Sequence, residues 1–213
     1  NYTNTEIEDI GTNASLFVNS LAGDRDALTI TNTFSPDTRD SFLTPTRGYD
    51  ISLATAYSGF GGAVESLKNT LTGGYHYSLS DDWTLSVGGR VGYLWDINDE
   101  TPLYDNFFLG GQTLRGFARA GIGPRDRATS DALGGQIMYG HNVELRFPFP
   151  YLRESGVQGV FFWDGGIVTE FDEQPQAQVE NDEVYRMSLG AGIFWRSPLG
   201  PLRLDFGVPI VKG

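Results

Sequence analysis

The chain has 213 residues, 27 acidic against 15 basic side chains, a net charge of -12 and no cysteine. The length is that of one ordinary domain, and the acidic balance argues against nucleic-acid binding, which depends on Lys and Arg to neutralise phosphates. The lack of cysteine excludes a disulfide scaffold, a thiolate metal cluster and a cysteine nucleophile. The two histidines, His76 and His141, are too far apart for the usual helical zinc motifs.

The hydropathy of the chain by itself suggests a soluble protein. No apolar run approaches the roughly 18 residues of a transmembrane helix, and the first ten residues do not have the pattern of a signal peptide. Membrane strands escape this test because they need only about 9 to 11 residues and alternate apolar with polar side chains. The 28 glycines and the aromatic content of 13% suit such strands.

Alternation with period two, which is typical of strands, recurs along the whole chain. The segments that show it are, in chain order, residues 12–20, 26–35, 49–57, 67–79, 85–95, 137–147, 157–169, 187–196 and 202–208. The sequence therefore predicts an all-β fold of about nine strands.

Three features favour a transmembrane antiparallel barrel over a soluble sandwich, which alternation alone cannot exclude. Several strands reach about a dozen residues, whereas about 5 to 6 is usual in soluble proteins. Tight turns alternate with long loops, although the link at 36–46 is long for the tight side. Aromatic residues lie at the strand ends, where interfacial girdles need them: Tyr49, Tyr57, Tyr93, Trp95, Phe147 and Trp195.

The longest link, about residues 98–131, is too rich in Phe, Leu and Tyr for a solvated linker. We expect it to fold back into the barrel lumen, where carboxylates of the inner wall would hold Arg115 as a buried cation. Strand parity places Glu144 and Asp164 on that wall, and the glycines after Asp164 leave room for a second backbone. The alternative is that Arg115 is exposed and the two acids line a wet channel.

The tip of this link resembles a known family. Gly110 and Gly111, followed by Leu114, Arg115, Gly116 and Phe117, are similar to the RGF loop tip of bacterial outer-membrane assembly factors of the BamA type. Four more elements follow in that family's order, at residues 132–135, 144–148, 161–166 and 197–202.

The resemblance implies a sixteen-strand barrel in the bacterial outer membrane. The first and last strands of such a barrel pair poorly, so that the seam between them templates incoming strands and thins the bilayer. Residues 1–213 would be part of that one barrel domain, with upstream POTRA domains, the early strands and the last strand outside the chain. An odd count of nine agrees with an incomplete barrel, because bacterial single-chain barrels close with an even number of strands.

The resemblance also implies the partners and the site. The partners would be unfolded outer-membrane β-barrel proteins, accessory lipoproteins, outer-membrane lipid and lipopolysaccharide, without nucleic acid. In that family the loop arginine contacts inner-wall acids, which assigns Asp164 and Glu144 to Arg115. We expect no catalytic residue, cofactor or metal; the acidic stretch at 170–183 lacks the EF-hand spacing of a calcium site.

Other functions stay open from the sequence. A two-partner-secretion or related translocation barrel of the same superfamily would share the loop arginine and the Asp-Gly strand. A passive porin would use the long loop only to constrict its pore. A barrel enzyme lacks a plausible Ser/His/Asp set.

Overall fold

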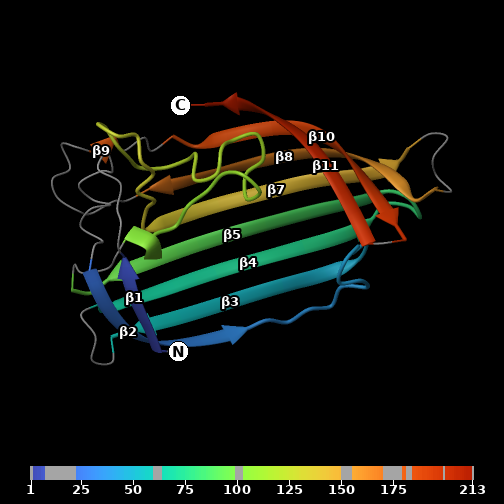
Figure 1. The fold of residues 1–213 in the computed structure, drawn as a ribbon. Coiled ribbons are helices and arrows are strands. Elements are labelled where there is room, and N and C mark those ends of the chain that lie inside the picture. Colours follow the sequence, from blue (N-terminus) through green and yellow to red (C-terminus); the bar gives the residue numbers. More distant parts are fainter. Residues whose placement is uncertain are drawn as a thin grey trace.

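The computed structural model describes residues 2–7, 23–59, 64–98, 103–149, 155–169, 179–180, 184–198 and 200–212. Nine strands form one antiparallel sheet in the order β1-β2-β3-β4-β5-β7-β8-β10-β11 (Figure 1). Their bounds are Tyr2–Ile7 (β1), Gly23–Phe34 (β2), Gly48–Ser58 (β3), Ser66–Ser78 (β4), Thr84–Asp96 (β5), Ile137–Pro148 (β7), Val157–Thr169 (β8), Arg186–Ser197 (β10) and Gly200–Val211 (β11).

The predicted all-β antiparallel fold is confirmed. Eight of the nine predicted strands coincide with observed ones to within a few residues. The ninth, at 12–20, lies outside the described residues, and β1 is at Tyr2–Ile7 instead, paired with β2. Strands β1 and β11 are the two edges of the sheet, so the described strands form an open, curved wall.

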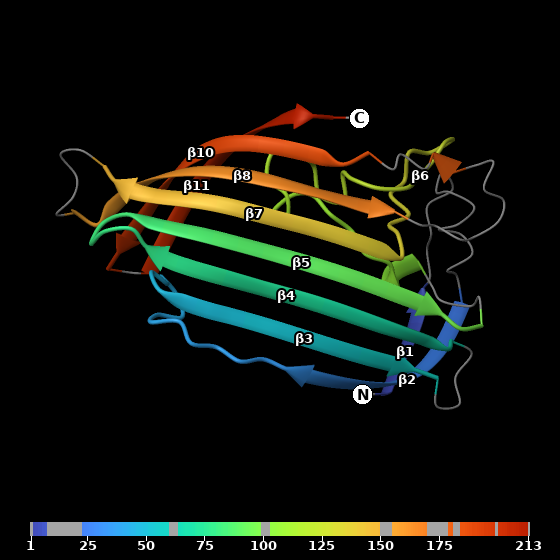
Figure 2. The ribbon, with the colours of Figure 1, turned by 180° about the vertical axis from the view of Figure 1, so that it is seen from behind.

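The apolar and polar faces of the strands are on opposite sides of this wall. In β5, Val87, Val91, Tyr93 and Trp95 are exposed by 44–55%, whereas alternate residues such as Leu94 are buried. The exposed row lies on the convex side, which Figure 2 shows from the front, and in the described part of the chain no second sheet covers it. A soluble sandwich would bury this face, so its exposure fits a wall that meets lipid.

Aromatic side chains gather near the end of the wall that carries the tight turns. The rings of Trp83 and Phe147 have centroids 5.6 Å apart, and those of Phe147 and Phe161 are 5.0 Å apart. Phe147 is opposite Gly159 in the β7–β8 register, which gives the ring space above a bare backbone. This stack is where an interfacial girdle is expected.

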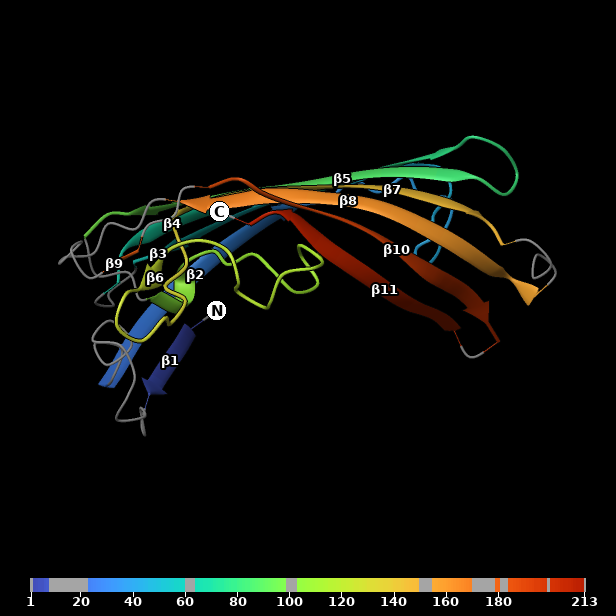
Figure 3. The same ribbon diagram turned by 90° about the horizontal axis from the view of Figure 1, so that it is seen from above.

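The core lies between the concave side of the wall and the long loop, whose described residues 103–136 cross that side (Figure 3). This loop contains the short 3-10 helix η1 (Leu103–Asp105) and β6 (Arg125–Asp126), and β6 pairs with β9 (Val179–Glu180). The buried cluster is made by Leu94, Phe107, Leu109, Leu114, Ile122, Met138 and Val168. No helix within the described ranges is long and apolar enough to span a membrane.

Wall glycines let the loop approach the sheet backbone closely. A Cβ on Gly92 would be 2.6 Å from the Phe107 ring, and one on Gly166 would be 2.9 Å from the Leu109 side chain. On β11, a Cβ at Gly207 would be 2.9 Å from the backbone nitrogen of Gly116. These distances are too short for real contacts, so side chains at these positions would push the loop away from the wall.

We therefore expect Gly92→Ala to lower the free energy of unfolding by about 1–3 kcal/mol, the usual cost of overpacking. The matched control is Gly89→Ala in the same strand, where the new Cβ would meet only a carbonyl oxygen at 3.6 Å. The measurement is urea unfolding of the purified protein in lipid vesicles. Equal effects of the two substitutions would contradict the close-packed loop.

Candidate functional site: the arginine cluster on the inner wall

The loop tip is a tight turn built on glycine. Gly110, Gly111 and Gly116 have φ angles of 125°, 63° and 88°, which disfavour residues with a Cβ. The Thr113 hydroxyl accepts a hydrogen bond from the amide of Gly110 (3.0 Å) and donates one to its carbonyl (2.9 Å). The amide of Gly111 donates to the carbonyl of Phe117 at 3.0 Å. The turn is therefore held by hydrogen bonds within the loop itself, from the backbone and from the Thr113 hydroxyl.

Arg115 projects from this turn onto Asp164 of β8. Its Nε and Nη2 donate to the two carboxylate oxygens of Asp164, each at 2.7 Å, and its backbone amide donates to Oδ2 at 3.1 Å. The guanidinium lies 3.6 Å from the ring centroid of Phe162, two residues earlier in β8. Two-pronged, charge-assisted bonds of this kind are strong and directional. Next to it, Leu114 is fully buried and anchors the tip in the core.

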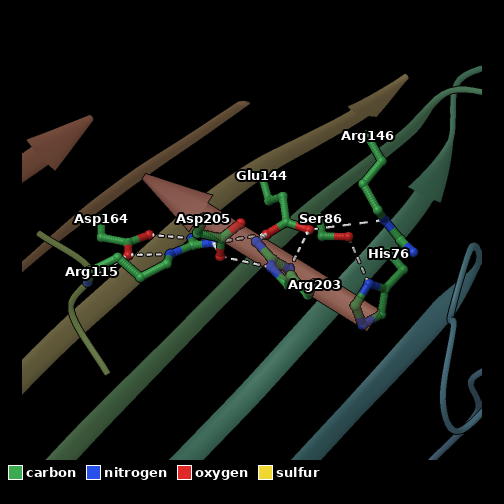
Figure 4. Close-up of polar contacts among 8 residues, drawn as sticks. All are labelled: His76, Ser86, Arg115, Glu144, Arg146, Asp164, Arg203 and Asp205. Carbon is green, nitrogen blue, oxygen red and sulfur yellow. Dashed lines mark hydrogen bonds and ion pairs between the residues drawn. The ribbon is translucent and has the colours of Figure 1, made fainter. Parts of the chain in front are cut away.

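The same guanidinium reaches two further strands. Its Nη1 lies 3.2 Å from Glu144 Oε2 on β7 and 3.1 Å from Asp205 Oδ2 on β11. Arg203, also on β11, donates to both oxygens of Glu144 (3.1 and 2.6 Å) and to Asp205 (2.7 Å). Figure 4 shows the resulting row of alternating charges. One loop side chain therefore links β7, β8 and β11.

Charge pairing keeps Arg115 ionised. Burial alone would lower its pKa, but the hydrogen bonds to Asp164 and Asp205 and the charge of Glu144 raise the pKa above its usual value. A buried guanidinium is tolerated only with such partners. Among the residues with a described position, no group of three His, Asp or Glu side chains is placed to hold a metal ion.

The structure brings together Arg115, Asp164 and Glu144, the three charged residues that the sequence singled out. Arg203, Asp205 and Phe162 were not singled out. In the sequence, Arg203 and Asp205 alternate with Leu202, Leu204 and Phe206, which indicates the polar face of their strand, but no local pattern connects that strand to the loop tip. Phe117 is partly buried against the core cluster. The acidic stretch 170–183 lies outside the described residues except for 179–180.

Comparison with known proteins identifies the family. The model of the Omp85 superfamily domain matches residues 1–213. The chain belongs to the Omp85 superfamily. This confirms the family to which the sequence was predicted to belong.

Several relatives of this Omp85 chain are assembly proteins by name. "Outer membrane protein assembly factor BamA" of Neorickettsia risticii is 30% identical over 210 residues, which is 98% of this chain and 28% of that protein. The "Sorting assembly machinery 50 kDa subunit" of Saccharomyces cerevisiae is 30% identical over 202 residues, which is 90% of this chain and 40% of that protein. The chain thus spans well under half the length of these relatives.

The fold is shared with a solved structure. The crystal structure of BamA from Haemophilus ducreyi lacking POTRA domains 1–3 superimposes with a TM-score of 0.80 at 22% identity, over 89% of this chain and 40% of that one. The nine-strand wall is therefore an Omp85 barrel wall.

The geometry of the cluster predicts that loss of the Asp164 charge destabilises the protein more than loss of the Asp205 charge. Asp164→Asn should lower the free energy of unfolding by about 3 kcal/mol, because breaking a buried ion pair leaves an uncompensated charge. Asp205→Asn should cost about 1 kcal/mol, because the Asp205 side chain is more exposed than that of Asp164 (16% against 3%). Denaturant unfolding in vesicles measures both. The reverse order would show that Asp164 is not the main partner of Arg115.

Proposed function

We propose that this chain is part of the barrel of an outer-membrane protein assembly factor, located in the bacterial outer membrane. The observation that carries the proposal is the lumen loop of an Omp85 wall, bound through Arg115 to β7, β8 and β11. Relatives named as assembly factors and as sorting and assembly components support assembly over transport. Residues 1–213 would form part of one barrel domain, with POTRA domains elsewhere in the protein.

The proposed activity needs no covalent chemistry. Incoming strands would pair with an edge of the barrel at a lateral seam, where backbone hydrogen bonds supply the affinity. The role of the arginine cluster would be to fix the shape of the wall, because Asp164 and Asp205 lie on the two strands that flank β10. The partners would be unfolded outer-membrane proteins, with accessory lipoproteins, lipid and lipopolysaccharide around the barrel.

Reversal of the loop charge tests the proposal. Arg115→Glu in the full-length protein should slow the insertion of a urea-denatured outer-membrane protein into vesicles by about tenfold, equivalent to about 1.4 kcal/mol in the barrier. In cells it should deplete heat-modifiable outer-membrane barrels. The reason is that a fourth carboxylate would face Asp164, Glu144 and Asp205.

Two further variants make the test specific. Arg119→Glu applies the same charge change to an exposed residue of the same loop and should leave insertion unchanged. Adding Asp164→Arg to Arg115→Glu should restore part of the activity by reversing the pair. Normal insertion by Arg115→Glu, with the variant present in the membrane, would refute the role of the cluster.

A further inference from the structure

The link of residues 35–47 between β2 and β3 is the long exception among the tight turns. It is an ordered hairpin that continues these two strands. The amide of Thr38 donates to the carbonyl of Tyr49 at 2.8 Å, and the amide of Asp40 donates to the carbonyl of Arg47 at 3.1 Å. These cross-strand hydrogen bonds give the hairpin a defined shape, so it can pack against other parts of the barrel in a fixed position.

Two carboxylates stabilise the hairpin from within. Asp40 accepts hydrogen bonds from the amides of Thr46 (2.8 Å) and Arg47 (3.1 Å), and Asp37 is paired with Arg39 at 2.6 Å. The hydrogen bonds from Arg39 lower the pKa of Asp37 to about 2. Because this pKa is depressed, Asp37 stabilises the hairpin above pH about 4 and loses that contribution only as the pH falls through about 2.

The hairpin crosses the concave side of the wall. The carbonyl oxygen of Pro45 accepts a hydrogen bond from the guanidinium of Arg146 on β7, although the hairpin connects β2 with β3. Strands β4 and β5 lie between β3 and β7 in the sheet, so the contact between Pro45 and Arg146 passes over both of them. It lies at the tight-turn end, opposite the end at which the loop of residues 103–136 leads into β7.

A polar network lies between the hairpin and the wall. Arg39 Nε is 3.5 Å from Asp50 of β3, and His76 Nε2 on β4 is 3.7 Å from the same oxygen. His76 Nδ1 is in turn 2.8 Å from the hydroxyl of Ser86 on β5, as Figure 4 shows. The hairpin thus contacts β3 directly through Asp50, and His76 extends the polar network from Asp50 to β4 and β5.

The anchor at β7 is shared with the arginine cluster. Arg146 is buried, with Nε 3.9 Å from Glu144 Oε1 and the guanidinium 5.6 Å from the ring centroid of Phe194. Glu144 also accepts hydrogen bonds from Arg115 and Arg203. The carboxylate of Glu144 therefore faces both Arg146, which anchors the hairpin, and Arg115, which anchors the lumen loop.

We propose that residues 35–47 form a second luminal lid, which closes the tight-turn end of the barrel interior with Arg146 as its latch. Tight turns mark the periplasmic end of outer-membrane barrels, so the lid would close the lumen from the periplasm. Thr84 supports this placement. It is opposite Arg146 in the β5–β7 register and is only 4% exposed, so we place it on the concave wall beneath the proposed lid.

The test measures access to the wall beneath the lid. Thr84→Cys is placed in the full-length protein, after replacement of any cysteine outside residues 1–213, and its reaction with a water-soluble maleimide is timed in vesicles. Replacement of residues 41–46 by Asn-Gly, which favours a two-residue hairpin turn, should speed labelling by about tenfold or more. Arg146→Met should have the same effect, because it removes the donor to Pro45.

The matched control is Arg47→Met, the same substitution at an exposed hairpin residue whose backbone alone makes the contacts described above. It should leave labelling unchanged. If Arg146→Met fails to fold, the labelling rate of the protein with the shortened hairpin tests the lid alone, because that change removes no residue of the wall. Unchanged labelling in the shortened hairpin, or an equal rise with Arg47→Met, would overturn the lid. The assembly function is measured separately on the same proteins, by the insertion of a urea-denatured outer-membrane protein into vesicles.

Discussion

The ion pair between Arg115 and Asp164 is the interaction on which the rest of the structure depends. A guanidinium on the inner wall is costly unless carboxylates surround it, and three different strands supply them here. Because the two-pronged geometry is directional, the pair fixes both the position of the loop tip and the spacing of the strands beneath it. The loop and the wall therefore hold each other in one arrangement.

The wall is shaped to receive that loop. Glycines at Gly92, Gly166 and Gly207 leave bare backbone where loop residues come closest. The buried core thus forms between the loop and the sheet, on the concave side, and leaves the other side free for lipid. This division explains how a chain of modest hydropathy can line a membrane: the bilayer takes the place of a second sheet.

Both ends of the concave side carry a segment that folds inward. The long loop enters from the end with long loops, and the hairpin of residues 35–47 covers the end with tight turns. Glu144 faces the cations that anchor each of them, Arg115 and Arg146. A charge change at Glu144 would therefore affect both segments, whereas the carboxylate of Asp164 binds Arg115 of the long loop.

The sequence by itself determined the strands, their inner and outer faces and the three central charged residues. Alternation is a local property, so parity could place Asp164 and Glu144 on the inner wall, and the loop motif singled out Arg115. Only the tertiary structure decided that Asp205, 90 residues from Arg115, completes the cluster and that Arg146 binds Pro45 across two strands. These contacts depend on the curvature of the sheet and on the path of each loop across it, which arise from the packing of the whole chain and leave no local pattern.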